Sequence, residues 1–374
     1  MAEEGGKEKV KQEKRSLDAR QVTLVVLGFG IGGGILTLPS LAAKVFGASG
    51  WLIVLVLGLF YTGGAWIAGR LAERFPEETI IEYSPRLLGK YLGLLFNLIF
   101  ITSFLLVIPI EIRILQELVN ISLLPDAPIW FVSGSFLLAI AYGASRQIDQ
   151  IAQVNELLIE IAIIVGLFVV LLAMQHFEPL HLLPFFSKDL IHPDKVNELV
   201  GMAFSFASFP VISMVVPYLR NPRQTTPAVV KGNIFITLVY TIFTLIVLGV
   251  FGYQETTKLS WVALELAKSI NIEAVILERL DLVLIVSWIS ALYTTALLAG
   301  FVVSASVKRM FKLKKHAYVI WALVPLVYYL STIFTNYFVW TRWSVYVAAL
   351  FVVISVFFYP LLYLLSSRKD KDHA

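Results

Sequence analysis

The stretch LGFGIGGGILTLPS, Leu27 to Ser40, decides the fold because it places five glycines and a proline inside a run that otherwise resembles a membrane-spanning helix. Glycine and proline weaken a helix, and the bilayer core holds no water to bond the backbone groups that they expose. Irregular backbone at this depth is tolerated only where protein or a water-filled cavity surrounds it. The stretch therefore predicts an unusual environment at the centre of the first span.

The composition is that of an integral membrane protein. Of 374 residues, 58% are hydrophobic and 15% are charged, and the mean hydropathy is +0.80. Ten runs are long enough to span a bilayer. They are Val22–Ala43, Val45–Gly69, Tyr91–Ile110, Ala127–Ser145, Ile151–Gln175, Leu199–Leu219, Gly232–Gln254, Leu282–Val307, Ala317–Thr341 and Trp343–Ser367. The chain has no cysteine, which excludes disulfides and thiolate metal sites.

Charge gives an orientation and a division into parts. Most of the 30 Lys and Arg residues fall at the chain ends and in alternate connections. Because cytoplasmic loops retain positive charge, we expect both termini to be cytoplasmic. We expect a disordered cytoplasmic tail over residues 1–18, a transmembrane domain over 19–367 and a short cytoplasmic tail over 368–374. This asymmetry explains the basic composition, so we expect the lipid bilayer and no nucleic acid as a partner.

The glycines lie near the middle of the bilayer. Gly32–Gly34 follow Arg20, at the inner edge, by about 12 to 14 residues, or ~18–21 Å at the helical rise. One interpretation is close packing of helices at small residues, and Gly30 and Gly34 have the spacing for it. Three consecutive glycines cover more than one helix face, which favours a break in the helix instead.

A second interruption falls at the corresponding place in the other half. Ten helices divide into five and five, and Leu199–Leu219 opens the second half with FSFASFP, in which Pro210 lies mid-span. Five helices per half also put the two halves in opposite orientation. Paired interruptions in corresponding helices are the best sequence pointer to the binding site of an inverted-repeat transporter fold.

The two breaks together predict a site for a small amino acid. The outer half of helix 1, starting near Gly34, presents free N–H groups and a positive dipole end that suit a carboxylate. Carbonyl groups near Ser205 and Phe206 suit an ammonium group, and Phe206 and Phe209 are placed to close over a small side chain. The candidate binding residues are Gly30, Gly32, Gly33, Gly34, Ser205, Phe206, Ser208 and Phe209. With no P-loop, metal cluster or nucleophile–base pair, we expect neither an ATP-driven pump nor an enzyme.

Acidic residues inside the spans are candidates for a proton relay or a gate. Glu156 and Glu160 are spaced i,i+4 on helix 5; the alternative is a partly hydrated pair bonded to Asn155 or nearby hydroxyls. On helix 3, Arg113 and Glu117 have the spacing of an ion pair, with a gate or relay as the alternative. Glu111 cannot share the helix face of Arg113, and we expect it to face a cavity.

A cation is the one further ligand that the residues suggest. Thr294 and Thr295, deep in helix 8, have hydroxyls that together with carbonyls of the helix 1 break suit a sodium ion. The alternative is that both threonines bond their own helix. Coupling to H⁺ or Na⁺ is thus open, and no other cofactor is expected.

Several motifs resemble a known family. IGGGILTLP is similar to the IGSGI…P motif of the amino acid–polyamine–organocation permeases, with Gly33 where Ser is common. Four further stretches resemble the spore germinant-receptor B subunits, a branch of that superfamily. They are RLLGKYLG (86–93), SLLPDAPIW (122–130), SFASFP (205–210) and ERLDLVLIVSW (278–288). The resemblance covers essentially the whole chain. It implies a protein of the spore inner membrane that senses a nutrient, usually an amino acid, with A and C subunits.

These observations predict an all-α membrane protein with ten transmembrane helices in a LeuT-like 5+5 inverted repeat with broken helices 1 and 6. The predicted function is that of a germinant-receptor subunit that binds a small amino acid. One alternative is an amino acid transporter coupled to H⁺ or Na⁺. Another is a subunit that conducts ions or water.

Overall fold

The computed structural model describes residues 16–183, 195–270, 280–333 and 337–372. Within these ranges the chain is helical, apart from turns and an isolated β-bridge between Leu17 and Leu219. The α-helices are α2 (Ala19–Gly30), α3 (Gly34–Phe46), α4 (Gly50–Arg74), α5 (Ile80–Leu88), α6 (Lys90–Ser122), α7 (Ile129–Ala144), α8 (Ile148–Ala173), α9 (Val196–Phe204), α10 (Ile212–Val215), α11 (Thr225–Thr256), α12 (Val262–Ser269), α13 (Leu280–Met310), α14 (His316–Ile333), α15 (Tyr337–Val352) and α16 (Tyr359–Asp372). Short 3₁₀ turns flank α10, and a π-helical turn, Val353–Phe358, joins α15 to α16.

Each predicted span overlaps a helix or a helix pair, but α15 begins at Tyr337, inside the predicted ninth span Ala317–Thr341. The count of ten is not reproduced by length and composition. Among the described residues, seven helical segments are long and apolar enough to cross a membrane. The pair formed by α9 and Phe209–Tyr218, bent by 46°, makes an eighth. The difference arises because α7 has only 16 residues and because the first predicted span is divided at its glycines into α2 and α3. The protein is an integral membrane protein of the all-α class.

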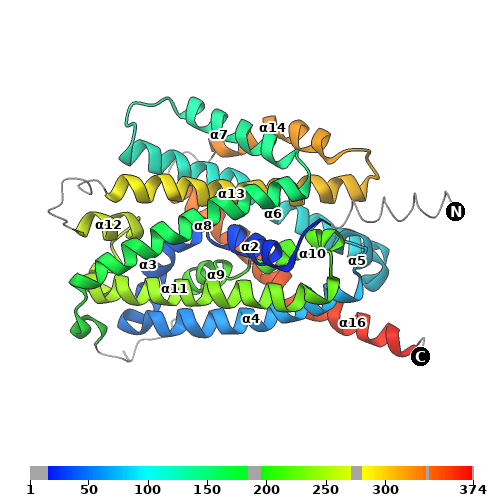
Figure 1. The fold of residues 1–374 in the computed structure, drawn as a ribbon, viewed down its shortest axis with the longest axis horizontal. Coiled ribbons are helices and arrows are strands. Elements are labelled where there is room, and N and C mark those ends of the chain that lie inside the picture. The colour runs from blue at the N-terminus through cyan, green and yellow to red at the C-terminus, as the bar shows by residue number, and fades with distance from the viewer. Residues whose placement is uncertain (1–15, 184–194, 271–279, 334–336, 373–374) are drawn as a thin grey trace.

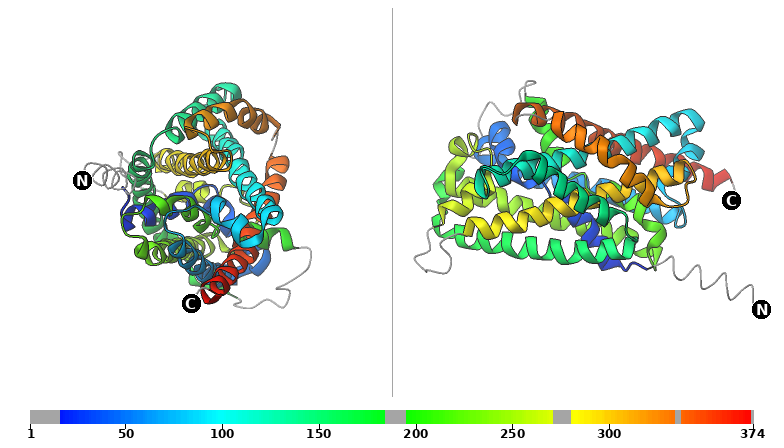
Figure 2. Two further views of the ribbon diagram at one scale, coloured as in Figure 1. Left: turned by 90° about the vertical axis from the view of Figure 1, so that its right-hand side faces the viewer. Right: turned by 90° about the horizontal axis from the view of Figure 1, so that it is seen from above.

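The helices form a bundle elongated along the spans, seen in Figures 1 and 2. Helices α4 and α11 lie side by side on one flank, and α7 and α14 lie together on the opposite flank. Between them, α13 contacts both α6 and α8. One end of the bundle carries α5 and the other carries α12 (Figure 1). These two ends are called the α5 end and the α12 end below.

Local sequence explains where two helices begin and why two others pack closely against each other. A capping box formed by Asp18 and Gln21 starts α2, and bonds of this kind satisfy N–H groups that have no partner within the helix. Thr79 and Glu82 form the same motif at the start of α5. Helices α4 and α11 pack closely because Gly69 has no side chain: a Cβ there would lie 2.7 Å from the Cα of Thr226.

Residues 16–18, at the end of the predicted N-terminal tail, contact the bundle, and α16 extends into the predicted C-terminal tail. Leu17 is fully buried; its N–H donates to the Tyr218 carbonyl at 3.0 Å and its carbonyl accepts from Arg220 N at 2.9 Å. The segment 16–18 is therefore part of the folded domain, because it joins the start of α2 to the end of the sixth span. Residues 1–15 lie outside the described residues. At the other end, α16 continues to Asp372, through most of the predicted tail 368–374.

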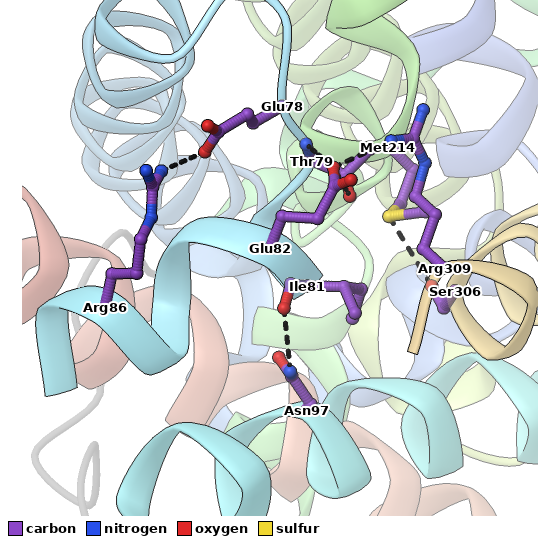
Figure 3. A network of polar contacts seen from close by, with 9 residues as sticks. All are labelled: Glu78, Thr79, Ile81, Glu82, Arg86, Asn97, Met214, Ser306 and Arg309. Atoms are coloured by element: carbon purple, nitrogen blue, oxygen red, sulfur yellow. Dashed lines mark hydrogen bonds and ion pairs between the residues drawn. The ribbon is translucent and has the colours of Figure 1, made fainter. Parts of the chain in front are cut away.

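Helix α5 lies at its end of the bundle and contacts the neighbouring α6 and the distant α13 (Figure 3). Asn97 of α6 donates its amide to the Ile81 carbonyl at 3.0 Å. Arg309, in the last turn of α13, donates to Glu82 at 2.7 Å. Since these contacts join α5 to helices of both halves of the chain, they hold the two halves together at the α5 end.

Candidate ligand site at two broken helices

The first and sixth spans are both interrupted where the sequence predicts it. Helix α2 ends at Gly30 and α3 begins at Gly34, with Ile31–Gly33 between them. Helix α9 ends at Phe204, the turn Ser205–Ser208 follows, and Pro210 lies in the first turn of the next helical segment. The predicted pair of broken helices is therefore confirmed.

The two breaks contact each other, which small residues allow. A Cβ on Gly30 would lie 3.2 Å from the Cβ of Ser208, and a Cβ on Gly34 would lie 3.0 Å from Ser205 Oγ. Larger side chains at these glycines would force the spans apart. The glycines thus interrupt helix 1 and also permit close packing of the two spans. The motif therefore has both of the features that were given as alternative interpretations.

A cavity leads from the breaks to the α12 end of the bundle. It has a volume of about 590 Å³, and its inner part is lined by Gly33, Gly34 and Ser205. Trp261 and Trp340 line it nearer the α12 end, with their rings stacked at a centroid distance of 6.3 Å. The site therefore has a route to the α12 end, while at the opposite end α5 is bonded to α6 and α13.

A second, much smaller cavity lies directly between the breaks. Its volume is about 20 Å³, enough for one water-sized group. Polar groups from three spans besides helix 1 reach it: Glu111 of α6, Ser205 and Ser208 of the helix 6 turn, and Thr295 of α13. The sequence identified each of these residues as a candidate, and the structure brings them together.

Glu111 points at the helix 1 break. Its side chain is 4% exposed, and Oε1 accepts a hydrogen bond from Gly33 N at 3.4 Å. Among the described residues, Oε2 has no hydrogen-bond partner. Glu111 lines both cavities, as expected for a residue that faces a cavity. Arg113 donates instead to Gln116, at 2.9 Å, and to Glu117.

Phe206 and Phe209 do not occupy the positions expected of them. Phe206 packs against Tyr61 and Tyr240, and Phe209 packs against Tyr61 and Tyr359. Neither ring lines either cavity. In a turn with i→i+3 bonds, residues three apart share a face. Ser205 and Ser208 therefore face helix 1, and the two phenylalanines face away from it.

Phe204 is an aromatic residue at the breaks that was not among the predicted site residues. It lines both cavities and packs against Phe351 at a centroid distance of 5.2 Å. Its position as the last residue of α9, directly before the turn, is the signal that identifies it in retrospect.

Glu156 and Glu160 lie at the α5 end, away from both cavities. Arg20 Nη1 lies 2.9 Å from Glu156 Oε1, and Nη2 of the same guanidinium bonds Glu160. The partner is thus an arginine of α2 and neither Asn155 nor a hydroxyl. Asn155 instead donates to the Leu24 carbonyl at 2.8 Å. This ion-pair cluster holds α8 against the start of α2.

Thr294 and Thr295 contact the chain just before the helix 1 break. Their hydroxyls donate to the Gly28 carbonyl at 3.2 and 3.0 Å. Both hydroxyls also lie within hydrogen-bond distance of the Ala291 carbonyl in their own helix. The two threonines therefore contact both their own helix and the helix 1 break. A sodium ion at this place stays a prediction.

The Arg113–Glu117 ion pair is present and is linked to the cavity wall. The two side chains approach to 3.2 Å, as the i,i+4 spacing predicts. The same Glu117 oxygen accepts from the indole N–H of Trp340 at 2.9 Å. The pair therefore positions one of the two tryptophans that line the larger cavity.

The comparisons with known proteins identify the family. The family model described as "Spore germination protein" matches residues 16–339. The chain belongs to the spore germination proteins. Spore germination protein YndE of Bacillus subtilis (strain 168) is 28% identical over 83% of this chain and 85% of its own. Spore germination protein GerLB of Bacillus cereus is 26% identical over 85% of each chain.

A solved structure confirms the fold. The crystal structure of MhsT in complex with L-phenylalanine superposes with a TM-score of 0.68, at 14% identity, over 92% of this chain and 87% of MhsT. The fold is therefore the LeuT-like one that the paired interruptions predict. Together, the family and the fold show a permease-like membrane protein of spore germination.

Proposed function

We propose that this protein is the membrane subunit of a spore nutrient germinant receptor, and that it binds a small amino acid at the two helix breaks to trigger germination. The observation that carries the proposal is the cavity of about 590 Å³, which ends at Gly33, Gly34 and Ser205. Family membership supports the role in germination. The bound L-phenylalanine named for MhsT supports an amino acid as the ligand class.

The breaks supply groups for both ends of a zwitterion. Helix α3 begins at Gly34 and directs its first N–H groups and its positive dipole end into the cavity, which suits a carboxylate. Glycine at this place lets the ligand approach the backbone. Phe204, which lines both cavities, takes the position over the ligand that Phe206 and Phe209 were expected to hold.

Binding acts on a conformational equilibrium. In this structure the α5 end is closed by the Leu17–Leu219 bridge and by Arg20, while the cavity leads to the α12 end. A ligand that bridges α3 and the helix 6 turn stabilises the conformations in which these elements are close. We assign the α5 end to the cytoplasm and the protein to the spore inner membrane, where A and C subunits sense the change.

Two other functions fit the same cavity. A transporter coupled to H⁺ or Na⁺ also needs a mid-membrane site with access to one side, and a conducting subunit also needs a central cavity. Purified protein in liposomes separates the three with a mixture of labelled common amino acids. Saturable binding without accumulation supports the receptor, accumulation against a gradient supports the transporter, and conductance without amino acid supports the conducting subunit. If no amino acid binds, the proposal is wrong.

A further inference from the structure

Glu111 is a buried carboxyl group whose second oxygen has no hydrogen-bond partner among the described residues. Its side chain is 4% exposed, in the middle of α6, and it lines both the cavity of about 590 Å³ and the cavity of about 20 Å³. A carboxyl group at this depth is costly unless it is paired or hydrogen-bonded. A positively charged donor beside this oxygen would offset that cost.

The described residues do not supply that donor. None of the ion pairs between described residues includes Glu111. Arg113, two residues along the same helix, is directed to Gln116 and Glu117. The one hydrogen bond that Glu111 accepts, from Gly33 N, is long at 3.4 Å. Glu198 of α9 also lines the larger cavity, and its Oε2 likewise has no hydrogen-bond partner among the described residues, but Glu111 alone of the two also lines the small cavity between the breaks.

We infer that Glu111 binds the ammonium group of the ligand, and that it makes the site selective for molecules with a primary amine. This inference rests on the proposed function and changes one part of it. The expected ammonium partners were the carbonyls near Ser205 and Phe206, but the Asn233 amide of α11, in the orientation that satisfies its neighbours, donates to the Phe206 carbonyl at 3.1 Å. Ser208 Oγ, buried and likewise without a partner among the described residues, lines the same small cavity and serves as a second acceptor.

The sizes of the two cavities agree with this assignment. The small cavity admits one group of the size of water, which an ammonium group matches. The larger cavity holds the rest of the ligand. Because Glu111 accepts from Gly33 N, the ligand's carboxylate binds the N–H groups of α3 from Gly34 onward. Glu111 is thus a specificity-determining residue that touches the ligand.

The test compares wild type with Glu111→Gln, which keeps the size of the side chain and removes its charge. Binding of the labelled amino acid mixture is measured in liposomes. Methylammonium serves as a second probe, read as a rise in melting temperature relative to the same concentration of NaCl. We expect Glu111→Gln to weaken amino acid binding by about ten- to hundredfold, as loss of a charge-assisted hydrogen bond gives. We expect methylammonium to stabilise wild type and not the variant.

Two further variants serve as a graded change and as a control. Glu111→Asp keeps the charge and withdraws it by one methylene, so we expect an intermediate loss of binding. Glu255→Gln removes an exposed carboxylate of α11 that pairs with Lys258, and we expect wild-type behaviour with both probes. The melting temperature and size-exclusion profile of each variant, measured without probe, show whether it folds.

The outcomes separate this inference from the proposed function. Equal amino acid affinity in wild type and Glu111→Gln overturns the role of Glu111 and leaves amino acid binding intact. An equal methylammonium effect on both proteins also overturns it. If wild type binds no amino acid but methylammonium stabilises it only when Glu111 is present, the proposed function fails and the ammonium site stands. If neither probe acts on wild type, both fail.

Discussion

The backbone of the helix 1 break is held by side chains of other helices, while the backbone of the helix 6 break bonds largely to itself. Around the first break, donors from α8, α11 and α13 reach the carbonyls of Leu24, Gly30 and Gly28, and α6 supplies an acceptor for Gly33 N. In the second, the N–H groups of Ser205, Phe206 and Ala207 donate to carbonyls three residues earlier. The two interruptions use different partners for the same kind of exposed backbone group.

The difference follows from the residues at each break. Glycines have no side chain, so other helices can approach the first break and bond its backbone. The second break has Phe206 and Phe209, which pack against Tyr61, Tyr240 and Tyr359 and fix the turn by burial. The first break therefore depends on a polar network that a ligand can join, and the second on apolar packing. Four predictions test this contrast.

The largest effect is expected at Gly32. A Cβ there would lie 2.4 Å from Thr295 Oγ1 and 3.2 Å from Glu111 Oε1. Gly32→Val should therefore displace both side chains, at a cost of about 2–3 kcal/mol, and weaken amino acid binding by about a hundredfold. Binding and thermal unfolding in lipid nanodiscs measure these changes. Gly63→Val, on α4, is the control because a Cβ at Gly63 meets nothing within 4 Å. Unchanged binding in Gly32→Val would remove this glycine from the site.

The next effect is expected from the two threonines that bond the Gly28 carbonyl. Replacing Thr294 and Thr295 together by valine removes both hydroxyls at nearly constant volume and should cost about 2 kcal/mol of stability, roughly 1 kcal/mol per hydroxyl. Thr241→Val is the matched control, because the Thr241 hydroxyl bonds the Thr237 carbonyl within its own helix. Thermal unfolding of the two variants measures the difference. Equal melting temperatures would show that the Gly28 carbonyl does not need these donors.

A pair of tyrosines contrasts the two breaks directly. The Tyr240 hydroxyl donates to the Gly30 carbonyl at 2.6 Å, at the end of α2. Tyr240→Phe leaves that carbonyl without this donor and should cost about 1–2 kcal/mol. The buried Tyr61 hydroxyl, beside Phe206 and Phe209, has no hydrogen-bond partner among the described residues. Tyr61→Phe should therefore leave thermal stability unchanged or raise it. A larger loss in Tyr61→Phe than in Tyr240→Phe would contradict the contrast.

The smallest effect is expected at Ser213, next to the helix 6 break. Its hydroxyl lies 2.7 Å from the Tyr359 hydroxyl, which also donates to the Pro210 carbonyl at 3.3 Å. Ser213→Ala removes the first contact and leaves the second, so we expect a loss of only about 0.5–1 kcal/mol. Amino acid affinity should stay at the wild-type value, since Ser213 lines neither cavity. A marked loss of affinity would mean that the second break also depends on polar contacts.

The features that the sequence predicted are those that depend on neighbouring residues. The spans follow from hydropathy, and the breaks at Gly30–Gly34 and Ser205–Pro210 follow from residues that interrupt any helix. The Arg113–Glu117 pair follows from helical spacing. The features that were missed join distant parts of the chain. Arg20 contacts Glu156 and Glu160 across more than a hundred positions, and local spacing carries no trace of such a pairing.

Sequence alone determined that this protein spans the membrane, that its first and sixth spans are interrupted, and that chemically suitable residues lie at both interruptions. These properties come from residue types and short spacings, which act wherever the chain is placed. Only the tertiary structure decided that Ser205 and Ser208 face helix 1 while Phe206 and Phe209 turn away, and that Glu111 points at the glycines. The direction of a side chain at a turn depends on what packs around it, and packing brings together residues that the sequence keeps far apart.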